Sequence, residues 1–109
     1  MNIEQIHEYA LSMEGAEETT PFGDNVIVYK VNNKIFFLLP LNTAPVQFNA
    51  KCDPDTAIEL RDQYSCIIPG YHMSKKHWNT VIIDGTLTAR QLKDFILDSY
   101  NLVAPKKKK

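Results

Sequence analysis

The sequence predicts an α+β domain with two layers, in which an antiparallel β-meander is covered on one side by helices. Consecutive β-type segments are separated by turns that are too short for crossover helices. Segments with the apolar spacing of helices stand at the start, in the middle and at the end of the chain. The 109 residues, of which 44% are hydrophobic and 23% charged, fit one globular domain. We expect the order α-β-β-β-α-β-α within a single domain of residues 1–105.

The first helix is predicted over Ile3–Met13. Asn2, followed three residues later by Gln5, forms a capping-box pattern at its start, and Gly15 is placed to end it. The apolar residues of the segment recur on one face of a helix: Ile3, Ile6, Ala10 and Met13. This face is the one we expect to be buried.

Three β-segments are predicted next. Asn25–Val31 is rich in β-branched residues, Asn32-Asn33 favours a tight turn, and Lys34–Leu39 supplies the second strand of the hairpin. Val46–Ala50 alternates between apolar and polar residues, as a strand with one buried face does. Ahead of these strands, the turn Pro21-Phe22-Gly23 is expected to bury its aromatic ring.

A second helix is expected to begin at Asp53-Pro54, because aspartate is a good N-cap and proline fits the first helical position. One stripe of this helix holds Ala57, Leu60, Arg61 and Tyr64. Ile67-Ile68 has the character of a further short strand, and His77–Ile83 that of a longer one. Thr88 caps a last helix over residues 89–101, in which Leu92, Phe95, Ile96 and Tyr100 share the buried face.

The charges of the chain are unevenly distributed. The formal net charge is −1, but four of the twelve basic residues form the terminal run Lys106–Lys109. Residues 1–105 therefore hold 8 basic and 13 acidic side chains, a balance of −5. This balance argues against a protein that coats nucleic acid non-specifically, because such binding depends on neutralising many phosphates. A nucleic-acid site must be local, and we expect residues 106–109 to form a basic, disordered tail.

No targeting feature is found in the sequence. The start, Met1-Asn2-Ile3-Glu4, lacks the basic and apolar stretches of a secretory signal, and no apolar run reaches the roughly 18 residues of a membrane span. The two cysteines, Cys52 and Cys66, then fit reduced thiols. We expect a cytoplasmic protein with no membrane partner.

The segment Gly70–Asn79 concentrates residues that suit an anionic ligand. It holds two of the three histidines, the only tryptophan and the adjacent lysines Lys75 and Lys76. Lysines suit phosphate groups, and flat rings suit bases or sugars. Composition alone favours a structural interpretation, in which Trp78 anchors the core, the lysines form a solvated loop tip and the histidines fill surface positions.

A longer pattern in this segment points to a family. Tyr71-His72-Met73-Ser74-Lys75-Lys76-His77-Trp78 resembles the signature of the MmcQ/YjbR family. Further landmarks of that family follow in the expected order: Pro21-Phe22-Gly23, Lys51-Cys52-Asp53-Pro54 and Ser99-Tyr100-Asn101-Leu102-Val103. The resemblance covers residues 3–103. Ser74 stands where the family usually has asparagine, and Glu14 stands where a proline often precedes the glycine.

The resemblance implies a frataxin-like (CyaY-like) fold and DNA binding through a double-wing motif. We expect a non-enzymatic protein that binds DNA through one basic and aromatic site, formed by Lys51, Tyr71, His72, Lys75, Lys76, His77 and Trp78. In this site the loop lysines contact phosphates, the rings stack or pack, and His72 donates a hydrogen bond. An alternative from another class is a module that binds a protein or a small molecule in a pocket around the His72–Trp78 loop. A monomer is expected in both cases.

Strand alternation assigns Trp78 to one face of the sheet. It places this residue with Thr80 and Ile82, opposite Val81 and Ile83. The latter pair is the more apolar one, so we expect it to face the helices. Trp78 is then a partly exposed platform on the other face, and tryptophan is a residue type enriched in binding hot spots.

Metal binding and nucleophilic catalysis are both weakly indicated. Cys66, His72 and His77 form a C-x5-H-x4-H pattern that the other cysteine could complete, but structural zinc sites use closer pairs. Cys52 follows Lys51 at a helix start, which favours a thiolate, and the neighbouring aspartate opposes it. We expect no metal, no cofactor and no catalytic residue.

Overall fold

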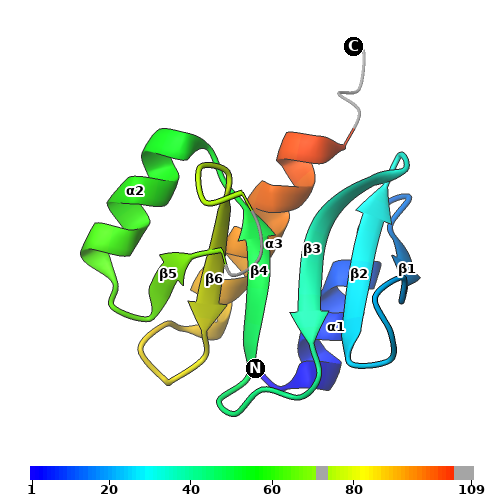
Figure 1. Ribbon diagram of the computed structural model, residues 1–109, viewed down its shortest axis with the longest axis horizontal. Helices are drawn as coiled ribbons and strands as arrows, with labels where there is room; N and C mark the ends of the chain where they lie inside the picture. Colours follow the sequence, from blue (N-terminus) through cyan, green and yellow to red (C-terminus); the bar gives the residue numbers. More distant parts are fainter. Residues whose placement is uncertain (71–73, 105–109) are drawn as a thin grey trace.

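The computed structural model describes residues 1–70 and 74–104, and these residues form a six-stranded antiparallel sheet and three helices (Figure 1). The strands are hydrogen-bonded in the order β1-β2-β3-β4-β6-β5. In chain order the elements are α1 (Ile3–Leu11), β1 (Glu17–Thr19), β2 (Val26–Val31), β3 (Lys34–Pro40), β4 (Gln47–Lys51), α2 (Pro54–Gln63), β5 (Ile67–Pro69), β6 (Trp78–Ile82) and α3 (Ala89–Val103). The predicted α+β class and antiparallel meander are confirmed.

The helices begin where their capping residues predict. Asn2 and Thr88 each form a capping box with a glutamine three positions further on, and the Asp53 side chain accepts a hydrogen bond from the first turn of α2. α1 ends at Leu11, two residues before the predicted Met13. In Figure 1, α1 and α3 lie behind the sheet, and α2 stands beside β5 and β6. Within residues 1–70 and 74–104, no helix combines the length and the apolar character needed to cross a membrane.

One strand of the sheet is not predicted by the sequence. β1 is an edge strand of three residues, Glu17-Glu18-Thr19, that pairs with β2. Its sequence has no alternation of apolar and polar residues. The segment is therefore a strand because it is hydrogen-bonded to β2, and not because its residues favour β-structure. At the other edge, β5 confirms the short strand expected near Ile67-Ile68. The β2–β3 turn has φ values of 51° at Asn32 and 63° at Asn33, which this type of two-residue turn requires and asparagine tolerates.

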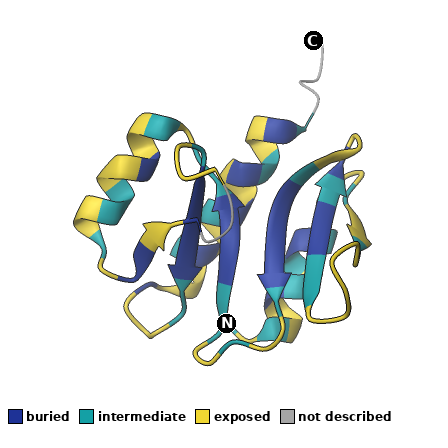
Figure 2. Ribbon diagram, in the orientation of Figure 1, coloured by how far each residue is buried: buried dark blue, intermediate teal, exposed yellow. Residues whose placement is uncertain are grey.

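Most of the core lies between the sheet and helices α1 and α3, on what we call the helix face. Its fully buried side chains include Ile6, Tyr29, Phe36, Phe37, Leu39, Phe48 and Ile96. The rings of Phe37 and Phe48, on neighbouring strands, have centroids 5.0 Å apart. Figure 2 shows burial along the central strands and exposure on the outer side of α2 and in the loops. Aromatic packing on this face therefore supplies a large part of the hydrophobic burial.

A second, smaller cluster lies on the opposite face of the sheet. It consists of Val28, Leu38 and Trp78, with Val26 and Ile35 packed against it. Asn49 and Thr80 are Cα partners beside this cluster, and their side chains are hydrogen-bonded to each other. Their exposed fractions are only 7% and 0%. The sheet is therefore buried along its centre on both faces.

The turn before β2 corrects one expectation. Phe22 is 68% exposed rather than buried. Gly23, with a φ of 100°, turns the chain directly after it, and the ring stays outside both clusters. The sequence predicts the turn correctly but not the position of its aromatic ring.

Candidate functional site

Lys51 lies beside the segment that enters β6, as the predicted site requires. It ends β4 and is the Cα partner of Trp78, the first residue of β6. One residue further on, the backbone N–H of Cys52 donates a hydrogen bond to the carbonyl oxygen of His77 at 2.7 Å. The backbone N–H of Lys51 donates to Ser99 Oγ on α3 at 2.8 Å. The end of β4 is therefore tied both to the entry of β6 and to α3.

The start of β3 reaches the same end of the sheet. Phe37 is the Cα partner of Ala50, so β3 begins near the point where β4 ends. The exposed Lys34 lies at the turn that joins β2 to β3, and segment 74–77 leads into β6 at this end (Figure 1). Three stretches of the chain thus bring four lysines to one end of the sheet. We call these residues the basic end: Lys34, Lys51, Lys75 and Lys76.

Arg61 on α2 holds the backbone of segment 74–77. Its guanidinium donates from Nε to Asn79 Oδ1 at 2.6 Å and from Nη2 to the carbonyl oxygen of Lys75. The backbone N–H of Trp78 donates to the carbonyl oxygen of Ser74 at 3.0 Å. Both lysines of the segment are exposed. The backbone is therefore fixed while both lysine side chains stay exposed, and Lys75 Nζ donates a hydrogen bond to the carbonyl oxygen of Gly70 at 3.4 Å.

No functional role is predicted for Arg61 from the sequence, which places it only on the stripe of the second helix. A role for Arg61 could have been predicted from its position on the helix stripe that it shares with Ala57 and Leu60. A charged side chain that turns toward a protein interior needs polar partners, because burying an unpaired charge is costly. The partners are an amide on β6 and a loop carbonyl. Arg61 is thus a positioning residue for the basic end.

Trp78 is buried, contrary to the exposure expected for it. Alternation assigns it correctly to the face opposite Val81, and it packs there with Val28 and Leu38. Only 8% of its surface is exposed. Alternation gives the face of a side chain but not what lies over that face, which explains the error. A stacking role for Trp78 stays a prediction, and it requires the ring to become more exposed than it is here.

The remaining residues of the predicted site are His77, Tyr71 and His72. His77 is half-buried, and its backbone N–H donates to the carbonyl oxygen of Ser74 at 3.3 Å. Tyr71 and His72 lie outside the described residues. The described part of the site is therefore mainly a group of lysines on a fixed backbone.

The cysteines are held as neutral thiols. Burial raises the pKa of Cys52, and the carboxylates of Asp53 and Asp98 raise this pKa further. The positive charge of Arg61 opposes them only in part. Burial also raises the pKa of Cys66. The surroundings of Cys52 therefore oppose the thiolate that its place at a helix start favours.

A metal site has no support in the described part of the chain. Across residues 1–70 and 74–104, no group of three histidine, cysteine, aspartate or glutamate side chains is arranged to hold a metal ion. His72, which belongs to the C-x5-H-x4-H pattern, lies outside these residues.

A cavity of about 170 Å³ lies between α2 and α3 on the helix face. The residues that line it are Ala50, Lys51, Cys52, Thr56, Leu60, Ile67, Asn79, Val81, Phe95 and Asp98. Asn79 and Val81 belong to the opposite side of β6 from Trp78. The alternative function predicts a pocket around the loop next to Trp78, and this cavity uses the other face of the same strand. Neither Phe95 nor Asp98 is predicted as a site residue from the sequence, because their approach to β4 depends on the packing of α3.

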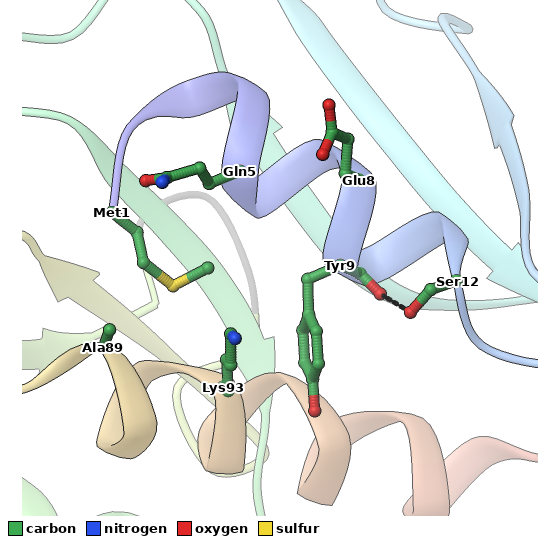
Figure 3. A pocket seen from close by; sticks show the side chains of 7 residues that line it. All are labelled: Met1, Gln5, Glu8, Tyr9, Ser12, Ala89 and Lys93. Carbon is green, nitrogen blue, oxygen red and sulfur yellow. Dashed lines mark hydrogen bonds between the residues drawn. The ribbon is translucent and has the colours of Figure 1, made fainter.

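A wider depression separates α1 from α3 (Figure 3). It measures about 590 Å³ and is lined by Met1, Gln5, Glu8, Tyr9, Ser12, Ala89 and Lys93. Gln5 is engaged in the capping box, and the Ser12 hydroxyl donates to the carbonyl oxygen of Tyr9 at 2.6 Å. The Lys93 ammonium lies 5.4 Å from the centre of the Tyr9 ring. Because Gln5, Ser12 and Lys93 already have partners, size alone does not make this depression the candidate site.

Comparison with known proteins identifies the family. The family model YjbR matches residues 11–102 of the chain. The chain belongs to the YjbR family. This confirms the membership expected from the Tyr71–Trp78 signature, whose residues lie within the matched range.

Relatives of this YjbR-family chain are found in several bacteria. It is 36% identical to protein YbdF of Escherichia coli O157:H7, over 94% of this chain and 88% of the relative. It is 29% identical to protein YjbR of Escherichia coli K12, over 100% of this chain and 96% of the relative. Both relatives are named as uncharacterized proteins.

Solved structures share the YjbR-family fold of this chain. The crystal structure of Deinococcus radiodurans protein DR2400 has a TM-score of 0.87 and 33% identity, and the match covers 93% of this chain and 77% of that one. A crystal structure from Pseudomonas syringae has a TM-score of 0.81 and 28% identity, with coverage of 94% and 99%.

Proposed function

We propose that this YjbR-family protein binds DNA without catalysis, through the basic end of its sheet. The observation that carries the proposal is the strand register, which brings Lys34, Lys51 and segment 74–77 to one end of β3, β4 and β6. Ammonium groups held on a rigid framework can contact neighbouring phosphates and fix the orientation of a duplex.

The distribution of charge supports a local site. Residues 1–105 carry 13 acidic side chains against 8 basic ones, and half of these basic residues belong to the basic end. An acidic remainder repels phosphate while the basic end attracts it. Such an asymmetric field orients an approaching polyanion. This distribution of charge also agrees with a protein that binds DNA through one end rather than with one that coats DNA non-specifically.

The fixed backbone of segment 74–77 also supports the proposal. Arg61 holds the carbonyl of Lys75, and Ser74 accepts hydrogen bonds from the backbone at the entry of β6. Binding then has to order only the exposed side chains. This limits the conformational entropy lost on association.

Fluorescence anisotropy with labelled double- and single-stranded DNA at two salt concentrations tests the proposal. The affinity should fall steeply as salt rises. Lys75→Ala together with Lys76→Ala should weaken binding and reduce the salt slope by about two, one for each phosphate contact.

The matched control is Arg90→Ala with Lys93→Ala. It removes two positive charges from the first turns of α3, whereas Ser99 near the other end of α3 bonds to β4. Its affinity and salt slope should stay close to those of the parent. Equal losses in the two double variants, or unchanged binding when the two loop lysines are removed, would overturn the basic end as the site. Deleting residues 106–109 in all three proteins removes the contribution of the lysine tail.

A further inference from the structure

The cavity between α2 and α3 has an apolar interior. Its floor is formed by side chains of the helix face of the sheet, Ala50, Ile67 and Val81, all of them buried. Leu60 of α2 and Phe95 of α3 form opposite walls. An apolar group that enters this space leaves water and gains dispersion contacts.

A groove of about 280 Å³ adjoins the cavity at the start of α2. Cys52, Thr56 and Asp98 line both spaces, and we call the place where the two spaces meet the passage. The groove adds Asp53 and Asn101 as polar lining residues. Together the two spaces reach the lower part of the range of about 300–1,000 Å³ that is usual for small-molecule sites.

The passage is negatively charged. Within the described ranges 1–70 and 74–104, neither Asp53 nor Asp98 forms an ion pair with a lysine or arginine. Lys51 lines the cavity, but its register opposite Trp78 directs its side chain to the other face of the sheet. Arg61 is engaged with the β6 amide and the loop carbonyl described above.

The pKa directions of Asp98 and Cys52 agree with a passage that holds no positively charged partner for Asp98 among the residues that the structure describes. Asp98 is an exposed residue of α3, and partial burial of its carboxylate, and then the carboxylate of Asp94, raise its pKa. A cation bound next to Asp98 would favour its ionised form. The raised pKa of Cys52 keeps the nearby thiol neutral, so Cys52 does not add a negative charge to the passage at neutral pH.

We propose that this cavity binds a small organic cation, a primary ammonium that carries one aromatic ring or a short alkyl chain. The apolar part fills the space between Leu60 and Phe95, and the ammonium lies in the passage at Asp98. A charge-assisted hydrogen bond to the carboxylate fixes the orientation of the ligand. The site lies on the helix face and selects positive charge. It therefore goes beyond the proposed DNA binding, which uses anionic phosphates at the basic end.

Phenethylammonium is a suitable probe, with 2-phenylethanol and phenylacetate as its neutral and anionic counterparts. In an NMR titration of the ¹⁵N-labelled full chain, phenethylammonium should shift the amide signals of Ala50, Thr56, Phe95 and Asp98. Its affinity should exceed that of 2-phenylethanol by about tenfold or more, as a charged hydrogen bond supplies, and phenylacetate should bind most weakly. Equal affinities for the three probes, or shifts that avoid the lining residues, would overturn the proposal.

Asp98→Asn tests the charged contact with almost no change in shape. It should reduce the affinity for phenethylammonium by about tenfold or more and leave that for 2-phenylethanol unchanged. The matched control, Asp62→Asn, removes the same charge from an exposed position of α2 that does not line the cavity, and it should bind like the parent. Unchanged binding by Asp98→Asn, or an equal loss in Asp62→Asn, would contradict the assignment.

The passage itself can be tested in two further ways. Thr56→Met places a longer side chain between the two spaces and should abolish binding of both phenethylammonium and 2-phenylethanol while the dispersion of the NMR spectrum is kept.

Phenethylammonium should also slow the alkylation of Cys52 by iodoacetamide in the parent but not in Asp98→Asn, with the buried Cys66 as internal reference. Alkylation of Cys52 at the same rate with and without phenethylammonium would place the probe elsewhere. Because the basic end is intact in these variants, DNA binding should persist whatever happens at the cavity.

Discussion

The two faces of the sheet are buried by different kinds of residue. On the helix face, rings such as Phe37 and Phe48 meet α1 and α3 in one large apolar cluster. On the opposite face, Trp78 belongs to a small cluster beside the buried polar pair Asn49 and Thr80. Four of the five residues of β6 are buried, whichever face they belong to. The difference shows that a central strand can lack a simple alternation of apolar and polar residues because both of its faces are covered.

The largest expected effect follows from the burial of Trp78. Trp78→Ala should lower the free energy of unfolding by about 3–5 kcal/mol, because it removes a large buried ring. Phe48→Ala on the helix face should cost a similar amount. Urea denaturation of both variants gives the loss in free energy of unfolding for each, so the contributions of the two faces can be compared directly. A loss within about 0.5 kcal/mol for Trp78→Ala, as at a surface position, would show that the opposite face adds little to stability.

A smaller loss is expected at the polar pair. Thr80→Val removes the hydroxyl that donates to Asn49 Oδ1 and leaves a buried amide oxygen without this donor. The free energy of unfolding should fall by about 1–3 kcal/mol. Combining it with Asn49→Leu should recover part of the loss, because neither polar partner then remains buried alone. If Thr80→Val is as stable as the parent, the polar pair does not contribute to the stability of this face.

The smallest effect on stability is expected at the exposed lysines of segment 74–77. Replacing both Lys75 and Lys76 by alanine should change the free energy of unfolding by no more than about 0.5 kcal/mol, since both side chains are exposed. Thermal and urea denaturation of the double variant check this. A loss comparable to that of Trp78→Ala would mean that the lysines support the fold, and weaker DNA binding by this variant could then not be assigned to lost phosphate contacts.

Local signals in the sequence predict most of the fold. Capping residues such as Asn2 and Thr88 determine where helices begin because their side chains bond to the first-turn backbone. The Asn32-Asn33 turn determines the central hairpin for a similarly local reason. β1 escapes prediction because Glu17-Glu18-Thr19 becomes a strand only through its hydrogen bonds to β2.

The candidate site is predicted only in part. The sequence pattern singles out Lys51 and the segment before β6, and the register of β4 with β6 shows that they are neighbours. Arg61 and Asp98 are missed because their partners lie on other elements, at distances in the chain that no periodicity reveals. The burial of Trp78 is missed for the related reason that it depends on contacts across the sheet rather than on the strand itself.

The two edges of the sheet have a consequence for how the protein behaves in concentrated solution. An exposed edge strand offers unpaired backbone groups on which another chain can add a strand and begin an aggregate. Here β1 and β5 are each only three residues long. Glu17 and Glu18 place negative charges on one edge, so a second copy that approaches edge to edge meets like charges. On the other edge, Pro69 has no N–H to donate to an added strand. The sheet is thus protected against aggregation at both edges by the residues of the edge strands themselves.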